Sequence, residues 1–324
     1  MAKRVQCDLC PTECVLEDYE VGGCKVRINK GGELFSLVYG RPCAVAVDPI
    51  EKKPFFHFLP STTAFSIATA GCVLGCKFCQ NWQISQARPE ETDNKTLMPD
   101  EVVRQALFFG CRSITYTYTE PTVFYEYMYD TARIAKSFAV RNTMHSCGYI
   151  KEKPLREVSK YMDAADVDLK AFTEDFYGRI CGGRLRPVLD ALVALKEEGV
   201  WVEITNLVIP TLNDDLHKIR EMCAWIVNNL GADVPLHFSR FFPYYKLKEL
   251  PPTPVGTLLD ARKAAMDSGM LYVYIGNLRS EAENTYCPKC GKVLVERAGY
   301  SVKQNKISGG RCGFCGNGIS GIWS

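Results

Sequence analysis

The sequence predicts an α/β fold in which helices cover a parallel sheet, with a small cysteine-rich segment at each end. Between about residues 63 and 277, short β-rich runs alternate with amphipathic helical stretches. Repeated strand–helix alternation is typical of a parallel sheet with helical crossovers. The sequence also contains 16 cysteines, and most of them fall in tight groups. Periodicity leaves open whether the sheet closes into a barrel.

Short β-rich runs supply the expected strands. They are AFSIAT (64–69), SITYTYT (113–119), RNTMHS (141–146), DAADVDLK (163–170), VWVEITNLVI (200–209) and PLHFSRFF (235–242). Amphipathic stretches between them supply the expected helices, at 99–110, 122–138, 186–199 and 214–231. Pro99 opens the first helix, and Gly199 and Gly231 close the last two, which are common start and stop residues.

The composition argues against several classes of protein. The chain of 324 residues is 47% hydrophobic and 23% charged, with a formal net charge of +2. Nucleic-acid-binding proteins usually carry a marked basic excess. A membrane-spanning helix needs about 18 or more consecutive apolar residues, and the sequence has no such run and no export signal. We therefore expect a cytoplasmic protein without a membrane partner, and see no case for a nucleic-acid partner.

Many cysteines without an export signal indicate metal binding rather than disulfides. Three close groups contain most of them: Cys7, Cys10, Cys14 and Cys24; Cys72, Cys76 and Cys79; and Cys287, Cys290, Cys312 and Cys315. The others lie singly and are expected to be small buried side chains: Cys43, Cys111, Cys147, Cys181 and Cys223. The expected organisation is an N-terminal metal-binding extension (1–60), the α/β core (61–280) and a C-terminal four-cysteine module (281–324).

The middle group, Cys72-x3-Cys76-x2-Cys79, follows the first expected strand, where the βα loops of a parallel sheet gather. Four thiolates normally hold a [4Fe–4S] cluster. Three leave one iron with an open position, by the logic that separates catalytic from structural zinc sites. There are two alternatives: a zinc site, or a closed electron-transfer cluster, each completed by a distant ligand. The position of the loop after the first strand favours a site of chemical reaction.

The pattern Cys-x3-Cys-x-aromatic-Cys, with Phe78 as the aromatic residue, resembles the signature of radical S-adenosylmethionine (SAM) enzymes. The following Gln80, Asn81 and Trp82 resemble activases of glycyl-radical enzymes, such as the pyruvate formate-lyase activating enzyme. The resemblance implies a partial (β/α)6 TIM-like barrel and a [4Fe–4S] cluster whose open iron binds SAM. It further implies an anaerobic oxidoreductase that cleaves SAM to methionine and a 5′-deoxyadenosyl radical, with a flavodoxin- or ferredoxin-like electron donor.

Two strand ends match the activases in part. Glu120 stands where the activases hold the amino group of SAM, but Tyr118 and Thr119 replace their two glycines. Asp168 and Lys170 resemble the Asp-Leu-Lys at the end of the fourth activase strand, and alternation places both side chains on one face. Charged groups that face a barrel interior need charged partners, which the methionine end of SAM would supply. A solvated pair at the rim is the alternative.

The remaining matches are looser, and ordinary strand-end packing is the alternative for each. Ser146 stands where activases have a small hydroxyl residue, although His145 departs from their acidic residue. Thr205 and Leu207 lie where the family packs adenosine, and Arg240 ends the sixth strand. The resemblance thus implies SAM contacts from Phe78, Asn81, Thr119, Glu120, Ser146, Asp168, Lys170, Thr205, Leu207 and Arg240, with Lys170 also a candidate catalytic residue.

The two flanking cysteine groups predict further metal sites. The knuckles CPKCG and CGFCG are typical of one tetrahedral ion, either zinc or rubredoxin-type iron. A module of about 40 residues cannot normally fold on its apolar surface alone, and a structural metal would stabilise it. The N-terminal group, Cys7-x2-Cys10-x3-Cys14-x9-Cys24, fits zinc or a second Fe–S cluster equally well. A cluster there could pass electrons to the radical site.

The segments CxLCPxxC, SLVYG, DPIEKKPFFHFLP and YIGN resemble the AmmeMemoRadiSam-system radical SAM enzymes over essentially the whole chain. By analogy with the activases, the target is a glycine Cα–H on a partner protein; a small metabolite or another peptide is the alternative. A non-enzymatic iron–sulfur carrier or zinc-ribbon adaptor is the rival class. The missing fourth cysteine in the middle group argues against the carrier, and the near-neutral charge argues against the adaptor.

Overall fold

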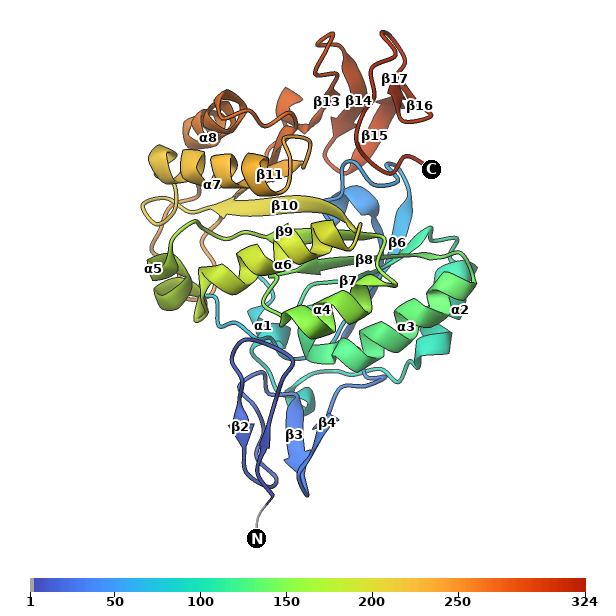
Figure 1. The fold of residues 1–324 in the computed structure, drawn as a ribbon, viewed down its shortest axis with the longest axis vertical. Coiled ribbons are helices and arrows are strands. Elements are labelled where there is room, and N and C mark those ends of the chain that lie inside the picture. The colour runs from blue at the N-terminus through green and yellow to red at the C-terminus, as the bar shows by residue number, and fades with distance from the viewer. Residues whose placement is uncertain (1–2) are drawn as a thin grey trace.

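The computed structural model describes residues 3–324, and a mostly parallel sheet forms the centre of this region (Figure 1). In the described residues its strand order is β12-β11-β10-β9-β8-β7-β6-β5. The strands are β5 (Ala44–Pro49), β6 (Thr63–Ala68), β7 (Ser113–Tyr116), β8 (Arg141–Ser146), β9 (Ala164–Asp168), β10 (Trp201–Val208), β11 (Leu236–Arg240) and β12 (Val273–Gly276). Strands β6 to β12 pair in parallel, whereas β5 pairs antiparallel with β6.

The predicted α/β class is therefore confirmed, and the sheet is wider than predicted. Each of the expected strands is present, β12 continues the parallel series at one edge, and β5 covers the other edge. The two edge strands, β12 and β5, are not paired with each other in the described part of the chain. The parallel series is thus a barrel that remains open, with the carboxyl ends of its strands at one rim.

Helices connect successive parallel strands and pack against the sheet (Figure 1). The longer ones are α2 (Pro99–Phe108), α3 (Tyr125–Ser137), α4 (Glu152–Ser159), α6 (Leu185–Glu197), α7 (Leu216–Asn229) and α8 (Val255–Asp267). Shorter turns are α1 (Trp82–Ser85), α5 (Glu174–Phe176), η1 (Ile50–Lys52), η2 (Pro89–Glu91), η3 (Pro121–Phe124), η4 (Tyr177–Cys181) and η5 (Glu281–Glu283). Their apolar faces and the strands share one large buried cluster, which includes Phe65, Ile114 and Val202.

The two cysteine-rich ends project from opposite ends of the molecule (Figure 1). The N-terminal one consists of the hairpins β1 (Val5–Gln6)/β2 (Val15–Leu16) and β3 (Arg27–Lys30)/β4 (Glu33–Ser36). The C-terminal module contains β13 (Thr285–Tyr286), β14 (Val293–Ala298), β15 (Ser301–Asn305), β16 (Ile307–Ser308) and β17 (Arg311–Cys312).

The C-terminal module is anchored to the segment that connects β5 to β6. The backbones of His57 and Ile322 are joined by an N–H···O bond of 2.7 Å, and a second bond of the same length joins Leu59 to Ile322. The buried Arg297 guanidinium donates to the Phe56 carbonyl at 2.7 Å and lies 4.1 Å from the centre of the Phe56 ring. Within the predicted N-terminal extension (1–60), Ala44–Pro49 thus joins the core sheet as β5, and Phe56, His57 and Leu59 contact the C-terminal module.

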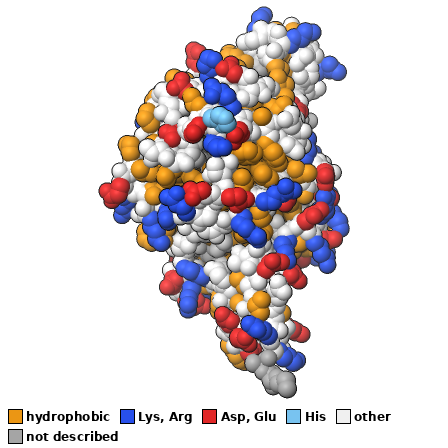
Figure 2. Space-filling model, turned by 60° about the vertical axis from the view of Figure 1, so that its left-hand side comes forward, with side chains coloured by type: hydrophobic (Ala, Val, Ile, Leu, Met, Phe, Trp, Pro, Cys, Tyr) orange, Lys and Arg blue, Asp and Glu red, His pale blue; other side chains and the backbone are white. Residues whose placement is uncertain are grey.

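The outer surface agrees with the balanced composition. On the face shown in Figure 2, basic and acidic side chains are interspersed, so this face carries no single-sign field that would favour a polyanion. Within residues 3–324, no helix is both long enough and apolar enough to cross a bilayer.

Candidate active site

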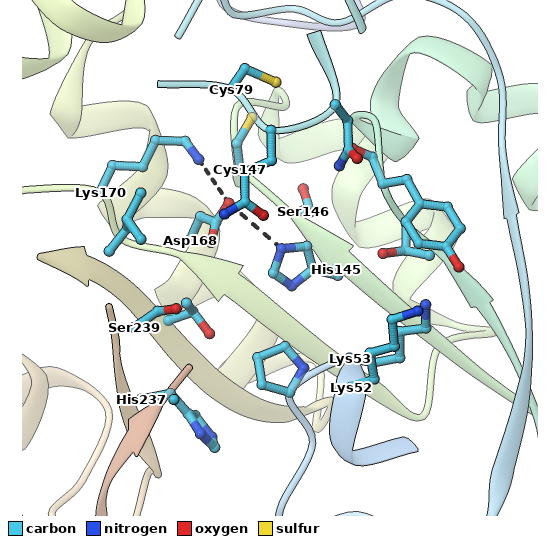
Figure 3. A pocket seen from close by; sticks show the side chains of 18 of the residues that line it. Lys52, Lys53, Cys79, His145, Ser146, Cys147, Asp168, Lys170, His237 and Ser239 are labelled. Carbon is cyan, nitrogen blue, oxygen red and sulfur yellow. Dashed lines mark hydrogen bonds and ion pairs between the residues drawn. The ribbon is translucent and has the colours of Figure 1, made fainter. Parts of the chain in front are cut away.

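A cavity of about 520 Å³ lies at the carboxyl ends of the parallel strands (Figure 3). Nearly all of the predicted site residues of the core line it: Cys72, Cys76, Phe78, Cys79, Asn81, Thr119, Glu120, Ser146, Asp168, Lys170, Thr205 and Leu207. Arg240 departs from the expectation, because it is not among the lining residues. Its Nε donates to the Thr253 carbonyl at 2.9 Å, and its guanidinium lies over the Phe242 ring.

The cluster loop, residues 72–79, connects β6 to α1 and is fixed by backbone hydrogen bonds. Gly75 donates to the Cys181 carbonyl and Lys77 to the Ile180 carbonyl, both at 2.9 Å, which ties the loop to η4. Gly71 enters the loop with φ +93°, in the left-handed region that favours glycine. A Cβ there would lie 2.5 Å from the Cys24 carbonyl oxygen, so the close approach of the N-terminal segment also requires glycine.

The thiols of the cluster loop are not set at the spacing of a single-ion site. In the described structure, the sulfur atoms of Cys72, Cys76 and Cys79 do not all lie within 4.8 Å of one another. Four thiolates around a single ion at about 2.3 Å stand only about 3.8 Å apart, whereas the thiolates of a [4Fe–4S] cluster each bind a different iron. Burial raises the pKa of Cys72 and of Cys79. A bound metal would lower both pKa values again, because cysteine binds metal as the thiolate.

Two cysteines that the sequence treats as isolated lie beside this loop. The Cys181 thiol hydrogen-bonds to Cys76 and lowers the pKa of Cys76, and the positive charge of Lys170 acts in the same direction. Cys147 lines the cavity next to Ser146 (Figure 3). The sequence carries no signal for either placement, because both cysteines come from segments distant from the loop.

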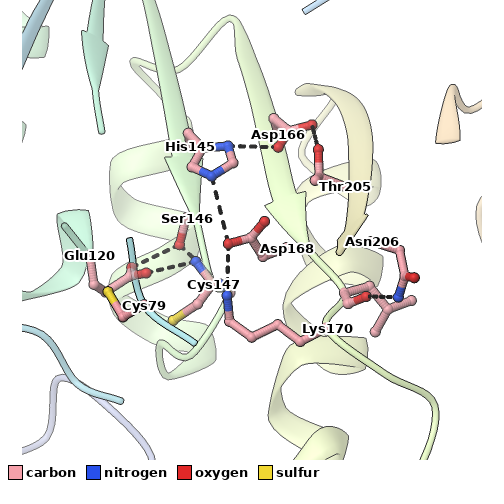
Figure 4. Close-up of polar contacts among 12 residues, drawn as sticks. Cys79, Glu120, His145, Ser146, Cys147, Asp166, Asp168, Lys170, Thr205 and Asn206 are labelled. Carbon is pink, nitrogen blue, oxygen red and sulfur yellow. Dashed lines mark hydrogen bonds and ion pairs between the residues drawn. The ribbon is translucent and has the colours of Figure 1, made fainter. Parts of the chain in front are cut away.

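Glu120 is held at the end of β7 by neutral donors (Figure 4). Its Oε1 accepts from the hydroxyls of Thr122 and Ser146, both at 2.7 Å, and its Oε2 accepts from the Cys147 backbone N–H at 2.7 Å. The side chain is buried, with 3% exposure. These donors hold the carboxyl group in place where it lines the cavity.

Tyr118 replaces an expected glycine and nevertheless adopts a positive φ of 63°. This conformation is costly for a residue with a bulky side chain, so other contacts must hold it. The Tyr118 hydroxyl donates to Asp48, and the ammonium of Lys53 lies 4.1 Å from the ring centre. Asn81 donates to the Tyr118 carbonyl at 2.8 Å, which ties this turn to the cluster loop.

A charged network connects the ends of β8 and β9 (Figure 4). His145 Nδ1 lies 2.7 Å from Asp166 Oδ1, at an angle that makes the contact an ion pair rather than a well-directed hydrogen bond. His145 Nε2 lies 3.6 Å from Asp168, whose other contact is Lys170 at 2.7 Å. Thr205 donates to Asp166 at 3.0 Å. Two carboxylates and two cationic groups thus alternate from the buried Asp166 to His145, Asp168 and Lys170, and the last three line the cavity.

The pKa values within this network follow its charges. Burial acts to lower the pKa of His145, but Asp168 and Asp166 outweigh it and raise that pKa to about 10. Burial acts to raise the pKa of Asp168, but Lys170 and His145 hold it below its usual range. Asp166 is more deeply buried, and burial raises its pKa to about 6 despite His145. Near pH 7 His145 is therefore an imidazolium.

The far wall of the cavity is built from the β5–β6 connection and the C-terminal module. Lys53 pairs with Asp48 at 2.6 Å, and burial lowers the pKa of Lys53 to about 8. Glu283 and Tyr300 contribute to the same wall from the C-terminal module, and His237 contributes from β11. The docked module thereby encloses the side of the cavity opposite the cluster loop.

Comparison with known proteins identifies the family. The profile of the radical SAM superfamily matches residues 66–223, which contain the cluster loop and strands β7 to β10. The chain belongs to the radical SAM superfamily. It is 44% identical over 319 residues to the uncharacterized protein MJ0808 of Methanocaldococcus jannaschii, covering 98% of this chain and 95% of that one. It is also 26% identical over 190 residues to a pyruvate formate-lyase-activating enzyme of Clostridium pasteurianum, covering 55% of this chain and 76% of that enzyme.

Solved structures share the radical SAM fold. A radical SAM methyltransferase from Sphaerobacter thermophilus superposes with a TM-score of 0.52 at 17% identity, over 73% of this chain and 71% of that one. The SuiB protein of Streptococcus suis superposes with a TM-score of 0.50 at 14% identity, over 70% and 52% of the two chains. These similarities extend to the fold, while the similarity to the activating enzymes places this radical SAM protein near the activases.

The C-terminal module of this radical SAM protein contains a preformed site for one ion. Its four cysteines, Cys287, Cys290, Cys312 and Cys315, have sulfur atoms within 4.8 Å of one another. The sulfur of Cys287 is 3.6 Å from that of Cys315, and the sulfur of Cys290 is 3.8 Å from that of Cys312. Four thiolates around one zinc or iron ion at about 2.3 Å would be about 3.8 Å apart, so the residues fit such an ion.

The N-terminal cysteines are arranged differently. Cys7 and Cys14 face each other at the end of the β1–β2 hairpin, with Cys7 N donating to Cys14 O at 2.8 Å. Burial raises the pKa of Cys7 and of Cys24, the charges of neighbouring thiols add to the rise, and Arg27 opposes it. No three of the four sulfurs, among the residues described, converge within 4.8 Å.

Proposed function

We propose that the cavity binds SAM against a [4Fe–4S] cluster held by Cys72, Cys76 and Cys79, and that the protein uses it to abstract hydrogen from a substrate. The observation that supports this most strongly is the single cavity that joins the three thiols to Glu120, Asp168 and Lys170. When bound, the cluster supplies the electron that cleaves SAM to methionine and a 5′-deoxyadenosyl radical.

The side chains of the cavity would bind and orient SAM. Glu120, already held by neutral donors, accepts a hydrogen bond from the amino group of the methionine end. Lys170 offers an ammonium to its carboxylate, and burial strengthens such contacts because little water competes with them. Thr205 and Leu207, at the end of β10, pack against the adenosine. The cavity walls would shield the reacting carbon from part of the solvent.

The substrate would enter next to the far wall. Similarity to activating enzymes supports a glycine Cα–H of a partner protein as the target. A small metabolite or short peptide is the second candidate, because Tyr300 and Glu283 of the C-terminal module narrow the space opposite the cluster loop. Lys52 and Lys53 both pair with Asp48, and Glu283 lines the same cavity, so this wall offers charges of both signs to a polar substrate.

Other parts of the proposal follow from the cysteines. All cysteines in the described part of the chain are free, which fits a reducing cytoplasm. The C-terminal module would hold a structural zinc or rubredoxin-type iron. A low-potential donor of the flavodoxin or ferredoxin class would supply the electron.

The test is the formation of 5′-deoxyadenosine from SAM by the anaerobically reconstituted full chain with dithionite. The wild type and a Cys111→Ala control should form it, because Cys111 lies at the amino end of β7, opposite the cavity. Cys76→Ala should form none. Product from Cys76→Ala at the wild-type rate, or failure of the wild type to bind SAM, would refute the proposal.

A further inference from the structure

We propose that Cys7, Cys10, Cys14 and Cys24 hold a second [4Fe–4S] cluster, rather than zinc, and that electrons enter the radical site through it. This inference extends the proposed function, because it names the route by which the catalytic cluster is reduced. It rests on the spacing of the four thiols and on their contact with the cluster loop.

The sulfur–sulfur distances in the three cysteine groups of this chain can be compared with one another. The C-terminal four stand at single-ion distances, with sulfur–sulfur separations of 3.6 and 3.8 Å. Among the described residues, neither the three thiols of the cluster loop nor any three of the N-terminal four have sulfur atoms that all lie within 4.8 Å of one another. A cluster requires the wider spacing, because each thiolate binds a separate iron atom. The N-terminal four thus follow the pattern of the cluster loop.

The N-terminal four nevertheless form one group. The β1–β2 hairpin brings Cys7 and Cys14 together, with Cys10 in the connecting turn. A Cβ at Gly22, two residues before Cys24, would lie 3.8 Å from the Cys14 sulfur. No three of the four sulfurs come within 4.8 Å of one another, so the described thiols are not gathered at the spacing of a single-ion site. Each of them is a cysteine, so a cluster here would be closed and would leave no iron free for SAM.

The N-terminal group touches the cluster loop directly. The Cys24 carbonyl approaches Gly71 so closely that a Cβ there would lie 2.5 Å away, and Gly71 precedes Cys72 in the chain. Lys25 contacts the Gln86 carbonyl, and the Gln86 side chain donates to the Leu74 carbonyl at 3.0 Å. Cys24 of the N-terminal group thus contacts Gly71, which is the residue directly before Cys72 of the cluster loop.

The same group is also fastened to the rim of the barrel. The Lys151 backbone donates to the Leu9 carbonyl at 3.0 Å, and its ammonium lies 3.2 Å from Asp8. The Arg184 guanidinium donates to the Pro11 carbonyl at 2.9 Å. These contacts come from the loops after β8 and before α6, so the N-terminal group is a fixed part of the active-site end.

The redox step is a one-electron transfer without proton movement. A low-potential donor protein of the flavodoxin or ferredoxin class loses one electron, and the N-terminal cluster is reduced from the 2+ to the 1+ state. It returns to 2+ when it passes that electron to the cluster of Cys72, Cys76 and Cys79. Dithionite, a small reductant, can reach the catalytic cluster without this relay.

The first experiment tests the identity of the metal. The triple variant Cys72→Ala/Cys76→Ala/Cys79→Ala leaves the N-terminal group intact and is reconstituted anaerobically with iron, sulfide and zinc. We expect Mössbauer spectra of one [4Fe–4S] cluster per chain, and an EPR signal after reduction that SAM does not change. One zinc ion bound at the C-terminal module is also expected. Two zinc ions and no cluster would overturn the proposal.

The second experiment tests the relay. Cys10→Ala/Cys14→Ala should retain the SAM-responsive cluster and the dithionite-driven formation of 5′-deoxyadenosine, but lose formation driven by reduced flavodoxin. In the fully reduced wild type, EPR should show spin–spin broadening between two clusters that neither variant shows. Equal flavodoxin-driven rates in the variant, the wild type and Cys111→Ala would overturn the relay. If no protein cleaves SAM with dithionite, the proposed function fails, while the metal content of the triple variant still decides the second cluster.

Discussion

Replacing His145 with glutamine should destabilise the protein through Asp166. Asp166 is fully buried, and His145 is its charged partner at 2.7 Å, with Thr205 as a neutral donor at 3.0 Å. Removing one partner of a buried ion pair typically costs about 3–5 kcal/mol. Protonation of Asp166 relieves part of this cost, because its pKa is already raised to about 6 by burial. We therefore expect a loss near the lower end, of about 3 kcal/mol.

The assay is thermal unfolding of the anaerobic, metal-loaded protein, followed by circular dichroism. One kcal/mol shifts Tm by about 2–4 °C in domains of 150–250 residues, so His145→Gln should lower Tm by about 6–12 °C at pH 7. The double variant His145→Gln/Asp166→Asn should recover most of the loss, because it leaves a neutral pair that can hydrogen-bond. Cys111→Ala, away from the network, serves as the control.

The pH dependence follows from the same residue. The pKa of His145 is about 10 in the folded protein, above its unfolded value of about 6.5. Its stabilisation is therefore fully present below about pH 6.5 and is lost as the pH rises through about 10. The difference in Tm between the wild type and His145→Gln should shrink from pH 7 to pH 10. Two results would refute this reasoning. One is a Tm for His145→Gln within 2 °C of the wild type, which at about 2–4 °C per kcal/mol means a loss of no more than about 1 kcal/mol. The other is no recovery of Tm in the double variant.

Three further predictions concern the cavity and the C-terminal module. Glu120→Gln should weaken SAM binding by about 10- to 100-fold in isothermal titration, because hydrogen bonds to charged groups contribute about 1.5–3 kcal/mol; unchanged affinity would exclude Glu120 as the amino-group contact. Cys181→Ala should retain the iron content and the EPR signal of the wild type, since Cys181 hydrogen-bonds to Cys76 and is not needed as a ligand; loss of the cluster would contradict this. Cys312→Ser should release the C-terminal ion and expose residues 285–324 to limited proteolysis while the cluster remains, because the four thiols of that module are positioned to hold one ion; a protease-resistant module would argue against a structural metal.

Much of the fold was predictable because local patterns are strong in the core. The expected strands recur as β6 to β11, since their β-branched and aromatic runs are bounded by clear turn residues. The missed elements had weaker local signals. Helix α4 contains Pro154, which reads as a breaker although the first turn of a helix tolerates proline. Strand β12 has four residues, and its place in the sheet depends on pairing with β11.

The site was predictable where one segment carries several of its residues. Spacing alone indicated the cluster loop, and alternation correctly placed Asp168 and Lys170 together, 2.7 Å apart. The partnership of His145 with Asp166 needs the register of β8 against β9, which no local pattern supplies. The left-handed conformation of Tyr118 depends on Asp48 and Lys53, which lie far away in the chain. Contacts of this kind arise only from the assembled sheet.

The decisive measurement concerns the open iron that the proposed cluster on Cys72, Cys76 and Cys79 would have. The full chain, carrying its cluster on Cys72, Cys76 and Cys79, is reduced and mixed with SAM labelled with 15N in its amino group. Electron–nuclear double resonance should then show a 15N hyperfine coupling to the cluster, and Cys76→Ala should show none. A reduced cluster with bound SAM but without that coupling would contradict a cavity built to place SAM on the iron.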